Sequence, residues 1–403
     1  MIATLFSTLI AALILFTPFF TPAEKPFASW YLLVATSFFL LFSFILTQIF
    51  AWAPIQKVQQ NLTPRLLEIY KKDNVIRLGG AFLALLAIFS LYLAVDGTIA
   101  KKVGDRPFTA IYFVLLGISI DIVHHIISRM TSYINPFAIA SQCTAHAKNA
   151  TLNGNDLELC NWIEAVSEVG INSASRSLPS LCNQAVIDLQ IISRDYLKAS
   201  KSFAHHVDKK AEGEKGDPVS FTLFFIFQRF EIIFNKALEH KLEPVITTII
   251  TSLGKMIVDS AKYDISMATY PIHYLGFLAA KAQRGGLAEV GDKAIVTYLE
   301  VAKVIVRDID LKYLELQEPF FTMTGRMEEL SKEIFRNNRE INIAILIQPF
   351  KQLKGLFEDE KLSQHQDSPV IVADINRVIN EFEQLQLVMK TIPPLTDITQ
   401  ESK

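Results

Sequence analysis

The sequence lacks the short motifs by which common enzymes are recognised. No GxSxG, Walker, HExxH or GxGxxG pattern occurs in its 403 residues, and its acidic residues form no catalytic pair of familiar spacing. The adjacent His205 and His206 precede a charged stretch, where solvated side chains are the ordinary case. These absences argue against common soluble chemistry. We therefore expect no enzyme activity, no cofactor and no resident metal.

Cysteines and charged residues are also scarce, which argues against a disulfide framework, a zinc site and a nucleic-acid partner. The three cysteines, Cys143, Cys160 and Cys182, are odd in number and form no CxxC pair, so neither a disulfide framework nor a zinc site is indicated. We expect small buried side chains in a reducing compartment. Only 20% of the residues are charged and the formal net charge is -2, which gives no indication of a nucleic-acid partner.

Hydrophobic residues are abundant instead, at 50% of the chain, and most of the excess lies in the first third. Four apolar segments, 2–20, 29–52, 78–95 and 108–127, match the roughly 20 residues that a helix needs to span a bilayer. No Lys or Arg precedes Lys25, and the first apolar run is longer than the core of a usual signal peptide. We therefore expect a bundle of four transmembrane helices, with the first one retained rather than cleaved.

Loop charge predicts the orientation of these spans. The loop 53–77 is the most basic one, and its charges include Arg65, Lys71, Lys72 and Arg77. Because basic loops stay in the cytoplasm, we expect a multi-pass protein of the cytoplasmic (inner) membrane with both termini on the cytoplasmic side. Anionic lipid heads attract such residues by about 1 kcal/mol each, so the loop is predicted to anchor to the lipid bilayer. The alternative is a link between the spans and the cytoplasmic domain.

A polar face interrupts the fourth span, in the stretch GISIDIVHHIISR. Gly117, Asp121, His124, His125 and Ser128 recur at steps of three and four, so they share one helical face. Asp121 precedes Arg129 by eight residues, which places it about 12 Å from the cytoplasmic end of the helix. A charged aspartate that faces lipid at this depth costs roughly 3 kcal/mol or more. We therefore expect it to face the bundle interior or water, or to be protonated.

Three interpretations of this polar face stay open. The side chains form a buried network that holds the bundle together, they line an ion or proton path, or they bind a metal or haem. The third is the weakest, because no other span supplies a His, Cys or Glu, and several chains would have to meet at a symmetry axis. Asp121 and His125 lie four residues apart, close enough to pair within one turn.

Two further stripes predict contacts between the spans. Small residues recur on the third span, where another helix can approach closely, and hydroxyl residues share one face of the second span, placed to bond across helices. The small residues are Gly80, Ala84, Ala87 and Ala94, and the hydroxyl residues are Thr36, Ser43 and Thr47. Ordinary packing of a helix bundle explains both stripes.

Residues 136–403 have the pattern of an all-α cytoplasmic domain. Apolar residues recur at helical spacing, no alternation typical of strands persists, and Asn155 precedes an amphipathic run as a helix cap. The charged stretch 208–218 predicts an exposed loop. The stretches 170–193 and 256–279 each predict a helix, a Ser-Ala break and a second helix, about 85 residues apart. Because this separation equals two helix pairs, we predict αα repeats of the kind that form α-solenoids.

Part of the sequence resembles a known bacterial family. Before the third span it carries Thr63, Pro64, Arg65, Leu66, Leu67, Asp73, Leu78 and Gly79, and late in the fourth span His124 and His125. These residues resemble a family of predicted membrane proteins, a domain of unknown function, whose motif reads Ser-Pro-Arg-Leu-Leu, then Asp, then Leu-Gly, with a later His-His pair. Thr63 replaces the family's Ser, and Asp121 is not a family position. The resemblance covers residues 55–135 and implies four spans followed by a cytoplasmic helical domain, without an activity.

Two classes of function follow from this predicted architecture. In the first, the protein is a homo-oligomeric channel or ion-translocating protein, whose path is lined by Asp121, His124, His125 and Ser128 and whose helical domain acts as gate or sensor. Four spans exceed what an anchor needs, which favours this class. In the second, the protein is a membrane-tethered helical scaffold or signalling module that binds a cytoplasmic partner protein.

Overall fold

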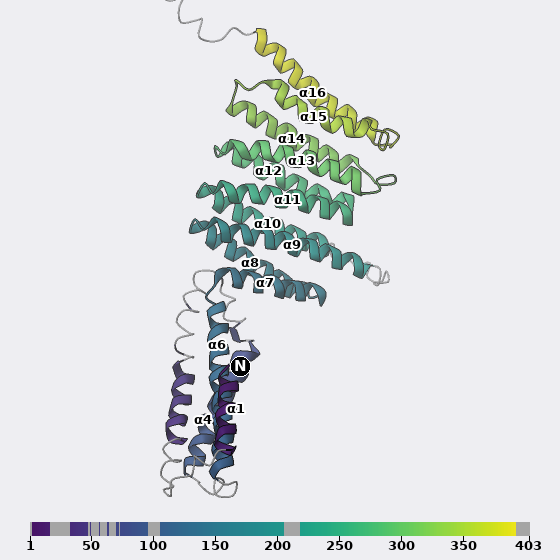
Figure 1. Cartoon of the computed structure of the whole chain (residues 1–403). Coiled ribbons are helices and arrows are strands. Elements are labelled where there is room, and N and C mark those ends of the chain that lie inside the picture. The colour runs from purple at the N-terminus through teal and green to yellow at the C-terminus, as the bar shows by residue number, and fades with distance from the viewer. Residues whose placement is uncertain are drawn as a thin grey trace, which may run out of the picture. The chain divides into compact units, whose positions relative to one another are not determined.

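The computed structural model describes residues 2–16, 33–46, 49, 56, 63, 70–71, 73–95, 105–204 and 218–391. These residues form helices joined by turns and contain no strand, so the all-α prediction is confirmed for the described part of the chain (Figure 1). The chain divides into two compact units, residues 1–139 and 140–403. The change of pattern that the sequence shows after residue 135 falls at the start of α7, Pro136–Leu152.

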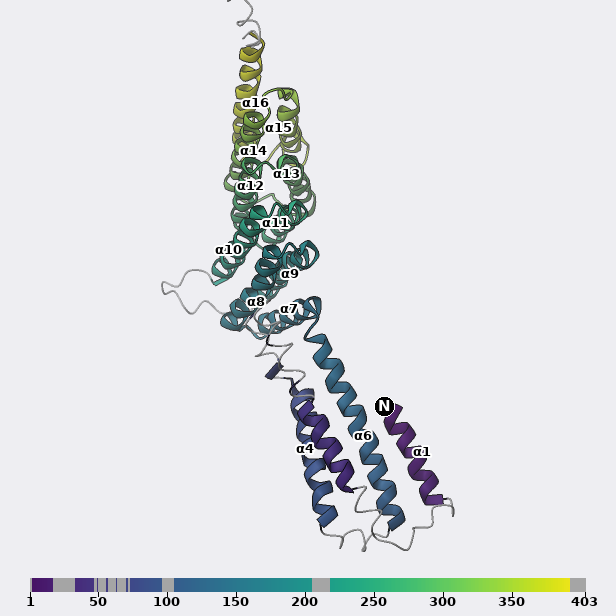
Figure 2. The same cartoon turned by 90° about the vertical axis from the view of Figure 1, so that its left-hand side faces the viewer.

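Four apolar helices make up most of the described part of the first unit. They are α1 (Ile2–Phe16), the unlabelled helix Leu33–Leu46, α4 (Asn74–Val95) and α6 (Asp105–Ser132). The start of α1 lies against Asp121, late in α6, and Asp73, just before α4, bonds Tyr133, just after α6. Both α1 and α4 therefore run antiparallel to α6, and the two helices begin at the end of the unit where α6 finishes (Figure 2).

Hydroxyl groups join three of these helices. The Thr36 and Tyr112 hydroxyls lie 2.6 Å apart, and the Tyr112 hydroxyl donates to Ser90 Oγ at 2.6 Å. Ser37 Oγ donates to the Ala87 carbonyl at 2.8 Å. The predicted bonding of Thr36 across helices is thus confirmed. Ala87 of α4 lies where Ser37 of another helix approaches its backbone. Thr47 lies outside the described residues. Since each bond satisfies a polar group that no water reaches in an apolar bundle, these contacts fix the register of the helices.

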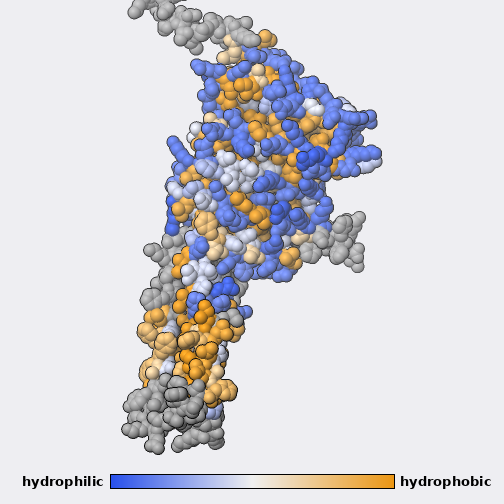
Figure 3. All heavy atoms as spheres, viewed as in Figure 1, coloured by the Kyte–Doolittle hydropathy of each residue, from blue (hydrophilic) through white to orange (hydrophobic). Residues whose placement is uncertain are grey.

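The first unit turns much of its apolar surface outward. Two of its described helices, Asn74–Val95 and Pro107–Ser132, are long and apolar enough to cross a membrane, while Ile2–Phe16 and Leu33–Leu46 are apolar but shorter as described. Only 33% and 28% of the apolar windows of the two long helices are buried, whereas the core helix of a soluble protein is mostly buried. In Figure 3 the visible described residues of this unit are mostly hydrophobic. The bundle of four spans stays a prediction.

The second unit is a stack of helices in two layers (Figure 2). One layer contains α9, α11, α13 and α15, and the other contains α8, α10, α12, α14 and α16, with each helix packed on the next of its own layer. The bounds are α8 Asp156–Ser175, α9 Pro179–Ala204, α10 Pro218–Glu239, α11 Glu243–Tyr263, α12 Thr269–Arg284, α13 Ala288–Asp308, α14 Gln317–Asn337, α15 Ile343–Glu358 and α16 Ser368–Thr391. A short 3-10 helix, Ile265–Ala268, precedes α12.

Each helix of the stack buries one apolar stripe between the layers. On α13 the stripe includes Val290, Ala294, Tyr298, Val301 and Ile305, which recur at steps of three and four. The fully buried Tyr298 hydroxyl donates to the Ile272 carbonyl of α12 at 2.7 Å, which satisfies its polar group inside the core. The alternation of such stripes with charged faces is the physical basis of the helical pattern seen in the sequence.

One type of turn recurs between successive helices. Gly154, Ser177, Lys241 and Gly286 each adopt a positive φ, of 63°, 54°, 51° and 86°. The following residue donates its N–H to the carbonyl five positions earlier, as from Asn155 to Ala150 at 3.0 Å and from Leu242 to Ala237 at 2.9 Å. This is the Schellman arrangement that ends helices. The predicted cap of α8 is confirmed, because Asn155 Oδ1 accepts the Glu158 N–H at 3.2 Å.

The repeat exists, but the two stretches that suggested it are not equivalent in the structure. Residues 170–193 contain the turn inside the pair α8 and α9, whereas residues 256–279 contain the junction between α11 and α12, through the 3-10 helix. A break after an apolar helix looks the same in sequence at both places, so the predicted register of the repeat is wrong. The predicted loop 208–218 lies outside the described residues, apart from Pro218, where α10 begins.

Candidate functional site

The Asp121 carboxylate caps the start of α1. Its Oδ1 accepts the Ala3 N–H at 3.3 Å, its Oδ2 accepts the Thr4 N–H at 3.0 Å, and Oδ2 also accepts the Thr4 hydroxyl. The first N–H groups of a helix have no partner within the helix itself, and a negative charge at this end also interacts favourably with the helix dipole. A residue of α6 therefore supplies a cap that ordinarily comes from the residue before the helix.

The remaining polar residues of α6 lie beyond the start of α1. Gly117 is buried against Ser7 of α1, whereas His124, His125 and Ser128 are exposed. At 3.6 residues per turn these exposed positions continue the side of α6 that carries Gly117 and Asp121. Because α1 begins level with Asp121, it covers only the first part of this side. The structure thus divides the predicted polar face into a covered part and an open part.

Of the four basic residues singled out in the loop 53–77, the structure describes Lys71 and Arg77. Lys71 is exposed, and Arg77 is exposed in the first turn of α4, where its Nη2 donates to Asn74 Oδ1 at 3.2 Å. Arg65 and Lys72 lie outside the described residues. Since α4 begins at Asn74, the helix starts four residues before the predicted span, and Arg77 is helical rather than part of a loop.

Asp73 ties the start of α4 to the end of α6. Its Oδ1 accepts the Val75 N–H at 2.8 Å as a local cap, and its Oδ2 accepts the Tyr133 hydroxyl at 2.6 Å. Arg129 lies 3.9 Å from the same oxygen. Burial of Tyr133, followed by its bond to Asp73, raises the pKa of this phenol, so the hydroxyl keeps its proton and remains a donor. The resemblance pointed to Asp73, but nothing in the sequence identified Tyr133 as its partner.

A second remote cap lies in the helix stack. Asp367, in the turn before α16, accepts the Leu316 N–H at 2.8 Å and the Gln317 side-chain amide at 2.8 Å, at the start of α14. His365 Nδ1 accepts the Asp367 N–H at 3.2 Å, and His365 Nε2 lies 3.1 Å from the Leu311 carbonyl. These buried groups join two connections that lie 50 residues apart in sequence. Their bonds are all internal, which makes this network structural.

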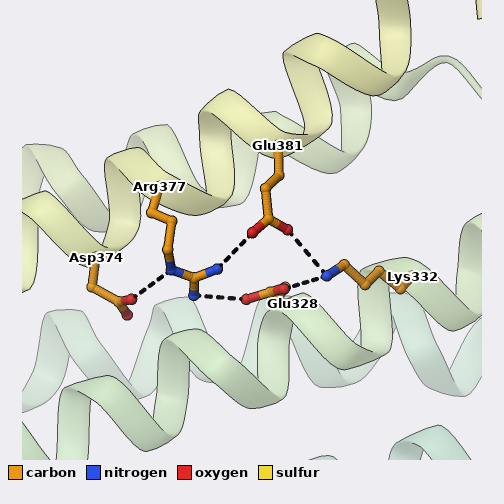
Figure 4. Close-up of polar contacts among 5 residues, drawn as sticks. All are labelled: Glu328, Lys332, Asp374, Arg377 and Glu381. Carbon is orange, nitrogen blue, oxygen red and sulfur yellow. Dashed lines mark hydrogen bonds and ion pairs between the residues drawn. The ribbon is translucent and has the colours of Figure 1, made fainter. Parts of the chain in front are cut away.

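Charged side chains bridge α14 and α16 on the surface of the stack (Figure 4). Arg377 donates to Glu328 at 2.9 Å, to Asp374 at 3.1 Å and to Glu381 at 2.8 Å. Lys332 bonds Glu328 and, at 3.1 Å, Glu381, so both bases share the two glutamates. The two helices are thereby linked by a closed ring of opposite charges.

The described residues show no grouping suited to a metal ion. No three of the described His, Cys, Asp and Glu side chains gather as a metal site. Cys143 and Cys182 are buried, Cys160 is half-buried, and none of the three forms a disulfide. Burial raises the pKa of the Cys182 thiol to about 12, so it behaves as a small apolar side chain. The expectation of buried cysteines is confirmed for Cys143 and Cys182.

Comparison with known proteins adds little to this picture. No family model and no curated protein matches the chain. Among solved structures, the chain is similar to one described as "Circular tandem repeat protein with novel repeat topology and enhanced subunit contact surfaces". The identity is 14%, the TM-score is 0.38, and the match covers 79% of this chain and 73% of that one. A similarity this low supports no statement about fold or function.

Proposed function

We propose that this protein is a membrane-anchored scaffold, in which the apolar helices of residues 1–139 hold the chain in a bilayer and the stack of residues 140–403 binds a partner protein. The observation that favours a scaffold over a channel is that Asp121 caps α1. An ion path needs ionisable groups that are available to the ion, whereas this carboxylate accepts three hydrogen bonds from α1. Its role as a cap accounts for a charge in an apolar helix.

Anchoring in a membrane is supported by the surface of the first unit. Large apolar side chains of α1, α4 and the helix Leu33–Leu46 point away from the protein, which in water would expose a patch far larger than monomers tolerate. An up-and-down arrangement of four crossings leaves the start of α1 and the end of α6 on one side. The basic Lys71 and Arg77 belong to the same end, and this charge favours the cytoplasmic face of the inner membrane.

Partner binding is supported by the architecture of the second unit. Helix pairs stacked in two layers contact only their neighbours, so the outer faces of both layers stay available along the length of the stack. The described side chains there offer no catalytic constellation, and the polar networks around Asp367 and Arg377 bond within the chain. A surface of this kind is suited to holding another protein beside a membrane.

Site-specific photocrosslinking in intact cells tests this proposal. A benzophenone side chain is placed singly at four exposed positions of the full-length protein, Leu157, Tyr270, Val296 and Val370, which lie on four different helices. A scaffold gives a discrete adduct from one or two of these positions, in the membrane fraction, and not from all four. No adduct at any position, or recovery of the protein in the soluble fraction, contradicts the proposal.

A homo-oligomeric channel is the second candidate, and one observation favours it. His124, His125 and Ser128 are exposed on one side of α6, so several copies could present them around a common axis. Ion and proton flux into liposomes that carry the purified protein, from about pH 5.5 to 7.5 where an ordinary His titrates, separates the two functions. A scaffold gives no flux above empty liposomes, whereas flux that is lost in the double variant His124→Ala with His125→Ala makes the protein a channel.

A further inference from the structure

Helices α13 and α15 are neighbours in one layer of the stack (Figure 2). An open groove lies between them. Its volume is about 540 Å³, within the usual range of ligand sites. The two walls have the same spacing: residues 295, 296, 299, 300 and 303 line one side, and residues 344, 345, 348, 349 and 352 line the other. Each set is one stripe of a helix, and the two stripes are 49 residues apart throughout, which makes the walls equivalent parts of successive repeats.

The floor of the groove is apolar and open to solvent. Val296 is 46% exposed and Ile345 is 61% exposed, while Leu299 lies deeper at 8%. Pro349, inside α15, has no N–H to give to the Ile345 carbonyl, so the backbone at this wall also lacks one helical bond. Burying such a floor under a ligand removes apolar surface from water, which supplies the main driving force for binding.

Polar side chains of two kinds rim the groove. Glu300 and Lys303 stand three residues apart on α13, and Gln348 and Gln352 stand four residues apart on α15. Within the part of the chain that the structure describes, none of these four side chains has an ion pair or a hydrogen bond. Carboxamides both donate and accept, which suits the peptide groups of an extended chain, and a Glu beside a Lys suits one ligand charge of each sign.

The length and the polar rim of the groove suit an extended chain better than a helix. Each wall rises about 12 Å along its helix, at about 1.5 Å per residue. A helix bonds its own backbone groups internally, whereas an extended chain leaves N–H and C=O groups free to bond the carboxamides of Gln348 and Gln352. Four steps of about 3.3 Å, which is five residues of extended chain, match the length of each wall.

We propose that this groove binds a short extended segment of the partner protein, with apolar side chains on the floor and one basic and one acidic side chain facing Glu300 and Lys303. Side chains two residues apart in an extended chain point the same way and lie about 7 Å apart. The segment therefore alternates apolar, charged, apolar, charged, apolar. This inference rests on the proposed scaffold function and names the chemistry of its partner.

An array of synthetic pentapeptides tests the proposal with full-length protein in detergent. The first, third and fifth positions are Val, Leu or Ala, and the second and fourth are Lys and Asp in either order, or Ser in the controls. We expect binding of charged peptides in one preferred order. The substitution Val296→Glu should weaken it at least tenfold, whereas Val370→Glu, the same change at a position 48% exposed on α16, should change it less than twofold.

Reversal of the rim charges gives the sharper result. The double variant Glu300→Lys with Lys303→Glu keeps the net charge and should reverse the preferred order of Lys and Asp in the bound peptides. Absence of binding by the parent protein, equal loss in the Val370 variant, or an unchanged order in the double variant overturns the groove proposal. Photocrosslinks from Tyr270 or Val370 without peptide binding would then leave the scaffold function standing, while the absence of all crosslinks would remove both.

Discussion

Several phenylalanines of the first unit are exposed, whereas several of the second unit are buried in its core. In the first unit Phe6, Phe38 and Phe42 are more than 60% exposed, whereas in the second unit Phe320 and Phe350 are at most 1% exposed. The same side chain thus serves two surroundings. In the stack Phe320 and Phe350 are held by packing inside the protein, but in the first unit these rings face outward, where the proposed membrane anchoring would remove them from water.

Removal of one ring in each unit gives the largest expected contrast. Phe350→Ala deletes a ring that packs against Phe382, with centroids 6.1 Å apart, and should cost about 3–5 kcal/mol of unfolding free energy. Phe42→Ala should cost less than about 0.5 kcal/mol in detergent, because the ring is 62% exposed and has little packing to lose. Unfolding of the purified full-length protein, followed by circular dichroism, measures both. A large cost for Phe42→Ala would mean that this face packs against protein rather than lipid.

The two remote caps extend the comparison at a smaller scale. Asp367→Ala strands the Leu316 N–H and the Gln317 amide inside the stack, so we expect a loss of about 1–3 kcal/mol. Asp121→Ala frees the first N–H groups of α1, but Asp121 is itself partly exposed, so we expect a smaller loss than for Asp367→Ala. The same unfolding measurement ranks the two variants. If the Asp121 variant is the less stable one, the start of α1 is enclosed more tightly than the single chain shows.

Asp121 shows which part of a functional site can be predicted from the sequence and which part cannot. A carboxylate in an apolar helix predicts that some partner exists, because its burial is otherwise too costly. The partners here are mainly backbone N–H groups of α1, and backbone groups carry no sign in the sequence. The same reason hid the role of Asp367. By contrast, Asn155 stood directly before its own helix, where local spacing is enough to identify a cap.

The buried acid Asp188, in α9 of the stack, makes the stability of the protein depend on pH. Asp188 is buried, its Oδ1 accepts a bond from Gln184 at 2.9 Å, and burial raises its pKa. The folded protein therefore holds this proton to a higher pH than the unfolded chain does, and the stability contributed by the proton is lost as pH rises through the folded pKa. Asp188→Asn should raise stability at neutral pH and flatten its decline above about pH 4. Unfolding at a series of pH values checks this, and an unchanged slope in the variant counts against a protonated Asp188.

The ring of charges between α14 and α16 predicts the smallest effect. Arg377 and Lys332 are about half exposed, and exposed ion pairs contribute little individually. Arg377→Met should cost about 0.5–1.5 kcal/mol at low salt and less at 1 M salt, because salt screens exposed charges. Arg336→Met, which loses a single pair with Glu333, should cost close to nothing. Equal costs for the two variants would show that the ring adds nothing beyond its separate pairs.

The stack shows which part of a repeat the sequence reveals. Helices were predicted from apolar spacing, because each one buries a stripe such as that of Val290, Ala294 and Tyr298. The register of the repeat was not predicted correctly, because two of the four recurring turns have Ser177 and Lys241, rather than Gly, at positive φ. The residue types at these turns do not identify them, and the Ser-Ala breaks predicted equivalence between positions that are not equivalent in the structure. Backbone hydrogen bonds define the turn, and many sequences satisfy them.

The cap on α1 has a consequence for biosynthesis. Asp121 follows Thr4 by 117 residues, so α1 leaves the ribosome long before the group that caps it has been made. At about 5–20 residues per second this interval lasts roughly 6–23 seconds. During that time the first N–H groups of α1 have to bond water or another temporary acceptor. Helix α1 therefore reaches its final contacts only after most of α6 has been made.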